Sequence, residues 1–134
     1  MLSVHLMFAG QCEEAFRFYE RTFAASRLTL VRYRDTPAAA DVPEDFRDKL
    51  VHATLVIGGQ ELAGADVVPE LHQSMRGFSV LFSAATQADA ERIFAALADG
   101  GAVHMALQQT FWSPAFGVLV DRFGTPWEIT ATAA

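Results

Sequence analysis

The order of the chain's apolar segments occurs twice, and this repeat restricts the possible folds more than any other feature of the sequence. Residues 3–8 (SVHLMF) are short, apolar and uncharged, as a buried strand is, and residues 78–83 (FSVLFS) repeat that pattern. Each is followed by a segment with apolar residues three or four positions apart, at 13–25 and 87–101. That spacing lines one face of a helix. A strand followed by a helix is therefore predicted at the start of each half.

Three further strands are predicted after each helix. Residues 27–34 alternate charged and apolar side chains with a period of two, and the Gly58-Gly59 pair is typical of a hairpin turn. Residues 35–48 contain two prolines and several acids and are predicted to form a long surface loop. The other predicted strands lie on both sides of the Gly-Gly pair within 50–66, and at 102–112, 116–123 and 127–133.

The element order strand–helix–strand–strand–strand therefore occurs over about residues 1–66 and again over about 77–134. We predict an α+β fold, with two βαβββ modules forming a curved, barrel-like mixed sheet and the helices outside. The 134 residues favour one domain made of both modules. Two curved sheets side by side would leave a water-accessible trough suited to a small molecule.

Composition argues against several classes of partner. The net charge of −6 would repel a phosphate backbone, so we expect no nucleic acid. No stretch approaches the roughly 20 apolar residues of a membrane span, so we expect no membrane partner. The first ten residues lack the basic residues of a secretory signal, and Cys12 is the single cysteine. We expect a cytoplasmic protein.

Three quoted segments resemble a known family over nearly the whole chain. They are FAGQCEEAFRFYERTF, VHATLVIGGQELAGAD and LQQTFWSPAFGVLVDRFGTPWEI. They are similar to the PhnB-like branch of the vicinal oxygen chelate superfamily, which includes glyoxalase I, ring-cleaving dioxygenases and bleomycin-resistance proteins. The resemblance implies paired βαβββ modules and a homodimer. It does not imply one particular reaction, because the branch has no common activity.

In metal-dependent members of the superfamily, the first and last strands of each module supply the ligands. The resemblance places Glu128 at the last-strand position of the second module, and Glu61 looks like its counterpart in the first. Counting from the following Gly-containing turn places Val4 at the first-strand position, and a shift of one residue would instead bring His5 there. Phe78 falls at the remaining position. If a divalent ion such as Zn, Ni, Mn or Fe is bound, His5, Glu61 and Glu128 are its candidate ligands.

Four residues are candidate contacts for an organic ligand: His52, Gln108, Trp112 and Glu128. An imidazole can act as an acid, a base or a ligand, amides orient polar groups, and Trp rings stack on flat molecules. Three of them have a structural alternative. His52 and Trp112 could belong to the core, and Glu128 could face solvent or pair with Arg122.

Three functions follow. The first is a small-molecule-binding protein in which the expected metal site is incomplete and no cofactor is bound. The second is a metal-dependent enzyme of the glyoxalase or dioxygenase type. The third is a protein that sequesters a cationic antibiotic, since the acidic balance would suit such a ligand and aromatic rings would stack on it. We expect the first, with activity as an enzyme left open.

Overall fold

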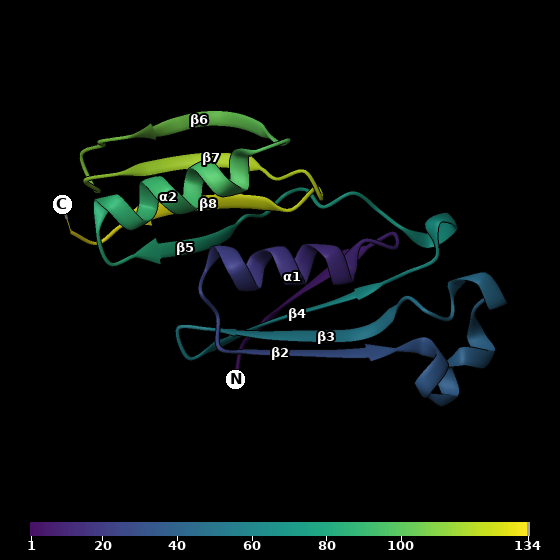
Figure 1. Cartoon of the computed structure of the whole chain (residues 1–134). Helices are drawn as coiled ribbons and strands as arrows, with labels where there is room; N and C mark the ends of the chain where they lie inside the picture. The colour runs from purple at the N-terminus through teal and green to yellow at the C-terminus, as the bar shows by residue number, and fades with distance from the viewer. Residues whose placement is uncertain (134) are drawn as a thin grey trace. The chain divides into compact units, whose positions relative to one another are not determined.

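Each half of the chain forms a four-stranded sheet with one helix against it, in a computed structural model that describes residues 1–133 (Figure 1). The N-terminal unit, residues 1–73, contains β1 (Val4–Phe8), α1 (Cys12–Thr22), β2 (Arg27–Arg32), β3 (Leu50–Ile57) and β4 (Gln60–Asp66). The C-terminal unit begins at residue 74 and contains β5 (Val80–Ala84), α2 (Gln87–Ala98), β6 (Ala102–Gln108), β7 (Phe116–Val120) and β8 (Pro126–Ala131). The predicted α+β fold of two βαβββ modules is confirmed.

The two sheets have the same topology. Their strand orders are β1-β4-β3-β2 and β5-β8-β7-β6, so the first strand of each unit lies beside the last. These pairs, β1–β4 and β5–β8, are parallel, and all other neighbours are antiparallel. Strand pairing therefore gives one mixed sheet in each unit. The hairpin between β3 and β4 turns at Gly58 and Gly59, whose φ angles of +56° and +79° suit glycine.

In the N-terminal unit the core lies between α1 and its sheet. Phe16 and Tyr19 of the helix are fully buried, as is Leu55 of β3. Gly64 of β4 lets the helix approach closely, because a Cβ atom there would lie 2.7 Å from Cε1 of Phe16. Gly64 therefore points toward α1, and so does Leu6, its partner across the β1–β4 pair.

In the C-terminal unit the core lies between α2 and its sheet. A Cβ atom at Gly117 of β7 would lie 2.5 Å from Cε2 of Phe94 in α2. Gly117 pairs with Ile129 of β8, which is fully buried. The close approach of helix to sheet thus depends on a glycine in both units, although the two glycines lie on different strands.

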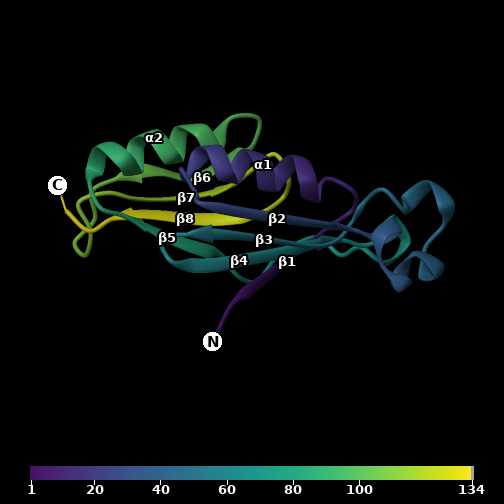
Figure 2. The same cartoon turned by 60° about the horizontal axis from the view of Figure 1, so that its bottom comes forward.

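The segment between β2 and β3 differs in detail from the predicted loop. The predicted strand 27–34 ends at Arg32, and short 3₁₀ turns follow at Tyr33–Asp35, Pro37–Asp41 and Glu44–Phe46 (Figure 2). The chain leaves the sheet here because Tyr33 packs on the buried Phe46, with ring centroids 5.8 Å apart, and its hydroxyl donates to the Asp66 carbonyl at 2.6 Å. The alternation of charged and apolar residues along the strand gives no information about these contacts, so it could not predict where the strand ends.

Candidate functional site

The face of each sheet opposite its own helix is called its far face below. Because side chains alternate along a strand, residues next to Gly64 on β4 point to the far face of the N-terminal sheet. These residues are Ala63 and Ala65, and their β1 partners His5 and Met7 point the same way. Val4 points toward the α1 side. Of the two first-strand residues considered from the sequence, His5 is the one on the far face.

Two imidazoles meet on this face. The rings of His5 and His52 are stacked with centroids 5.9 Å apart and 22° between their planes. A ring nitrogen of His5, Nδ1, lies 3.1 Å from Sδ of Met7. Burial lowers the pKa of His5 below its usual value near 6.5, and the neighbouring His52 lowers it further. His5 therefore favours the neutral form, which can accept a hydrogen bond or bind a metal.

Glu61 lies at the start of β4, two residues before Ala63, and so also points to the far face. Its side chain is exposed, and its backbone carbonyl accepts a hydrogen bond from Oγ of Ser3 at 2.8 Å. The residue that pairs with His5 across β1 and β4 is Ala63. The structure therefore places Glu61 beyond the row of the sheet that holds His5.

On the far face of the C-terminal sheet, one row crosses all four strands. Strand pairing aligns Leu81, Glu128, Val118 and Met105 from β5, β8, β7 and β6 in that order. Glu128 is half-buried, whereas Leu81 is 59% exposed and Met105 is 38% exposed. A single carboxylate thus lies in an apolar row that is open to a ligand.

The ligand set of the metal-dependent relatives can be compared with these positions. Leu81, and not Phe78, is the β5 residue paired with Glu128, and Phe78 lies outside the strand. No residue of β5 is a His, Asp, Glu or Cys, and Ala63 pairs with His5. Within residues 1–133, no three His, Cys, Asp or Glu side chains gather as a metal site would need. The residues present do not fit a four-ligand divalent site built from the first and last strands.

Aromatic side chains border one end of the far face of the C-terminal sheet. Trp112 packs edge-on against Phe116 of β7, with ring centroids 5.3 Å apart, and against Phe111 at 4.6 Å. Trp112 is 56% exposed and Phe111 is 98% exposed. Trp112 is therefore not a core residue of its unit, and its indole face is available for stacking.

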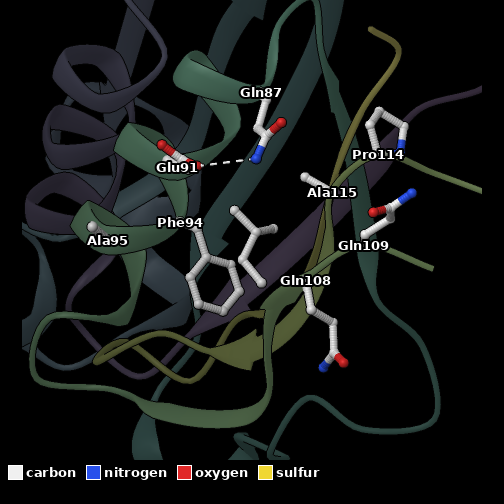
Figure 3. Close-up of a pocket in the computed structure, with 9 residues that line it drawn as sticks. Gln87, Glu91, Phe94, Ala95, Gln108, Gln109, Pro114 and Ala115 are labelled. Atoms are coloured by element: carbon white, nitrogen blue, oxygen red, sulfur yellow. Dashed lines mark hydrogen bonds between the residues drawn. The ribbon is translucent and has the colours of Figure 1, made fainter. Parts of the chain in front are cut away.

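Gln108 lies at the end of β6 and, after two register irregularities, pairs with Phe116 of β7, so it shares the far face with that residue. It also borders a pocket of about 380 Å³ between α2 and the end of β6, whose other lining residues include Gln87, Glu91 and Phe94 (Figure 3). Gln87 donates to Glu91 at 3.3 Å, and the Gln108 amide donates to the Ala106 carbonyl at 3.0 Å. Gln87, Glu91 and Gln108 thus already have local partners.

Two buried carboxylates organise the loops beside the strands. Asp66 accepts hydrogen bonds from the backbone N–H groups of Gly10, Cys12 and Leu50 at 2.9, 2.9 and 3.0 Å. Asp121 accepts from the N–H groups of Phe123 and Thr125 and from the indole of Trp127. The role of Asp66 was not predicted, although an acid that ends an apolar strand is the signal that could have revealed it.

Cys12 begins α1, where a helix dipole lowers a thiol pKa. Burial instead raises the pKa of the Cys12 thiol above its ordinary range, and the carboxylate of Asp66 raises it further. The thiol is fully buried. Cys12 is therefore a packing residue, not a nucleophile.

Comparison with known proteins identifies the family. Residues 1–130 match the family model described as 3-demethylubiquinone-9 3-methyltransferase. The chain belongs to this PhnB-like family. A putative 3-demethylubiquinone-9 3-methyltransferase, PhnB protein, from Bacillus cereus is 26% identical in sequence, with 98% of each chain covered and a TM-score of 0.78.

Two relatives are more similar in sequence. Protein YjdN of Escherichia coli K12 is 35% identical over 96% of this chain and 92% of its own length. The crystal structure of PA1353 from Pseudomonas aeruginosa is also 35% identical, covers 100% of this chain and 98% of its own, and has a TM-score of 0.90.

A more distant neighbour shares the fold. A glyoxalase/bleomycin resistance protein/dioxygenase family enzyme from Burkholderia phytofirmans matches 96% of this chain and 95% of its own, with a TM-score of 0.64 and 14% identity. Its likeness concerns the fold alone. No helix within residues 1–133 is long and apolar enough to cross a membrane.

Proposed function

We propose that the protein binds a small organic molecule on the far face of the C-terminal sheet, without a divalent metal of the glyoxalase type. The observation that carries this proposal is the row Leu81–Glu128–Val118–Met105, where one half-buried carboxylate lies among exposed apolar side chains. An exposed row of this kind leaves apolar surface in water, and a ligand that covers it would gain from removing that surface.

The side chains of this face define the chemistry of the ligand. A carboxylate accepts hydrogen bonds and favours a positive charge, and half-burial strengthens both interactions over those in bulk water. The aromatic rings of Trp112 and Phe116 border the same face. The ligand that fits best has an ammonium or other donor group for Glu128 and a flat or apolar body for the rings.

Several further assignments remain predictions. His52 lies on the far face of the N-terminal sheet beside His5, and its role as a ligand contact is untested. Gln108 pairs with Phe116 at one end of the far face of the C-terminal sheet, and its role as a ligand contact is also a prediction. The homodimer and the cytoplasmic location expected from the sequence and the family are also proposals.

The test uses a charged probe and its uncharged analogue. The ¹⁵N-labelled chain is titrated with 2-phenylethylamine and, separately, with 2-phenylethanol. Both should shift the amide resonances of β5, β7 and β8, and the amine should do so at a lower concentration than the alcohol. Glu128→Gln should weaken binding of the amine at least tenfold, which is about 1.4 kcal/mol. Binding of the alcohol should not change. Glu61→Gln, which alters an exposed carboxylate on the other sheet, is the matched control.

Equal binding of both probes to the wild type and to Glu128→Gln would exclude the carboxylate as the recognition element. A stoichiometric divalent ion that Glu128→Gln removes would support the metal-dependent enzyme instead. Adding Zn²⁺, Ni²⁺ or Mn²⁺ to the purified chain and measuring the bound ion by elemental analysis distinguishes the two functions.

A further inference from the structure

Three soft donor atoms gather on the far face of the N-terminal sheet. They are an imidazole nitrogen of His5, an imidazole nitrogen of His52 and the thioether sulfur of Met7. His5 and Met7 are two residues apart on β1 and so point the same way, and Nδ1 of His5 is 3.1 Å from Sδ of Met7. The ring of His52 stacks on that of His5 with centroids 5.9 Å apart, so the third donor lies on the same face beside the other two.

The register explains how side chains from non-adjacent strands can meet. β4 lies between β1 and β3, so the rings of His5 and His52 reach each other across it. The β4 residues on this face are Ala63, opposite His5, and Ala65, opposite Met7. Both alanines are buried, at 6% and 5% exposure. Their methyl groups form a floor low enough for larger side chains from both neighbouring strands to converge above it.

The donors remain accessible from solvent. His5 and His52 are exposed, and Met7 is 38% exposed. The imidazole of His72 contacts the carbonyl of Met7 at 3.2 Å, which holds the backbone that carries the thioether. An ion can therefore approach the three donors without a rearrangement of the sheet, and a rotation of the exposed rings is enough to direct their nitrogens toward it.

We propose that His5, Met7 and His52 form a binding site for a monovalent soft metal ion, copper(I) in particular. A thioether donor selects copper(I), and imidazole is compatible with copper. All three donors are uncharged when they bind, so a singly charged ion leaves less uncompensated charge at the site than a divalent one. A nitrogen and a sulfur 3.1 Å apart can share one ion with metal–ligand bonds of about 2.0–2.3 Å.

Other ions fit this site less well. Calcium and magnesium require six or more oxygen ligands, and the cluster contains none. Structural zinc needs four ligands, commonly including thiolate or carboxylate. Cys12 is buried, and Glu61 does not join the two histidines in any three-residue group within the described chain. The site also differs from the four-ligand set expected from the superfamily, because it uses Met7 and His52 and excludes Glu128.

This inference is independent of the ligand proposed for the C-terminal sheet, since it concerns other residues. The experiment is an anaerobic titration of the full chain with copper(I), in competition with the chromogenic chelator bicinchoninate. The wild type should withdraw one equivalent of copper from the chelator. X-ray absorption at the copper edge should show both nitrogen and sulfur neighbours.

Substitutions assign the donors. Met7→Leu keeps the size and apolar character of the side chain but removes the sulfur, and His52→Ala removes one imidazole. Each should weaken copper(I) binding at least tenfold and leave the thermal unfolding midpoint within a few degrees of the wild type. His104→Ala removes an exposed histidine of β6 in the other unit and should leave copper binding unchanged.

The proposed site would be wrong if Met7→Leu bound copper(I) with unchanged affinity. It would also be wrong if the X-ray absorption spectrum showed no sulfur neighbour of the copper. A loss of copper in Glu128→Gln would also overturn it, because the ion would then bind to residues of the superfamily's expected set. Weak binding that His104→Ala reduces as much as His52→Ala does would identify the copper as bound nonspecifically to exposed histidines.

Discussion

The two units share a topology but present different chemistry on their far faces. Both place the first strand in parallel beside the last, and both bring a helix close to the sheet over a glycine. On the far face, the N-terminal sheet carries His5, Met7 and His52 above two alanines. The C-terminal sheet carries a carboxylate in an apolar row.

This difference shows which constraints a repeated module must keep. The face beneath the helix must be apolar and closely packed, because its burial stabilises the unit. The far face is less closely packed against the rest of its unit, so its side chains can differ without loss of the fold. The two proposals follow this difference: a soft metal ion for the far face of one unit and an organic molecule with a donor group for that of the other.

The largest effect is expected for the buried carboxylates, which have parallel roles in the two units. Asp66→Ala would leave two buried and one half-buried backbone N–H groups without an acceptor and should lower the free energy of unfolding by about 3 kcal/mol. Asp121→Ala should do the same in the other unit. Urea denaturation measures both. The exposed Asp45→Ala is the control, and its effect should be far smaller. If Asp121→Ala left the free energy of unfolding nearly unchanged, the two carboxylates would not have equivalent roles.

The glycines under the helices should come next. Gly117→Ala would place a Cβ atom 2.5 Å from the Phe94 ring and 3.0 Å from the backbone of Leu107, and Gly64→Ala would place one 2.7 Å from the Phe16 ring and 3.1 Å from the carbonyl oxygen of Leu6. The contacts are shorter at Gly117, so we expect losses of about 3 kcal/mol for Gly117→Ala and about 2 kcal/mol for Gly64→Ala. The same denaturation experiment compares them. The reverse order would mean that the α1 interface is the more rigid one.

A smaller effect is expected from the ion pair that joins α1 to β2. Hydrogen bonding to Arg32 lowers the pKa of Glu13 below its usual value near 4.5, and Arg17 contributes less. The pair is about one-third exposed, so Glu13→Gln should lose less than about 1 kcal/mol at pH 7. Because the folded pKa is depressed, this difference should be complete above pH 4.5 and vanish as the pH falls through the folded pKa.

Glu14→Gln is the matched control for that experiment, because Glu14 lies in the same first helical turn and is exposed. Stability is measured by denaturation at a series of pH values. A loss in Glu14→Gln as large as that in Glu13→Gln would assign the effect to the helix dipole instead of to Arg32.

The smallest effect concerns the imidazole pair of the N-terminal far face. Burial is the larger cause of the lowered pKa of His5, and His52 is the smaller one. His52→Ala should therefore raise the pKa of His5 only part of the way toward 6.5, as followed by NMR of the imidazole resonances. An unchanged pKa of His5 would mean that the two rings do not interact in solution. A lowered pKa implies that this group's contribution to stability decreases as the pH falls below 6.5.

Most of the fold could be predicted from periodicity. Helical spacing in 13–25 and 87–101, with apolar strands between turn residues, was enough to predict both modules and the Gly58-Gly59 hairpin. The end of β2 was not predictable in this way, because it depends on the packing of Tyr33 on Phe46, a residue 13 positions further along the chain.

The candidate site was less accessible to such reasoning. Whether Val4 or His5 points to the far face depends on the register of β1, because a shift of one residue exchanges the two faces. The sequence contains no feature that fixes this register. The partner of Glu128 was expected near Phe78 and is Leu81. Nothing in the sequence indicated that Met7 could be a ligand, because a methionine in an apolar strand is usually a core residue.

The sequence by itself determined the order of the elements and the apolar character of the faces under the helices, because local periodicity and turn residues encode both. Only the tertiary structure decided which polar side chains lie together. His5 and His52 are 47 positions apart and meet over two alanines of a third strand, and Glu128 lies between residues of β5 and β7. Such groupings arise from the pairing of distant strands, and pairing depends on the packing of the whole sheet.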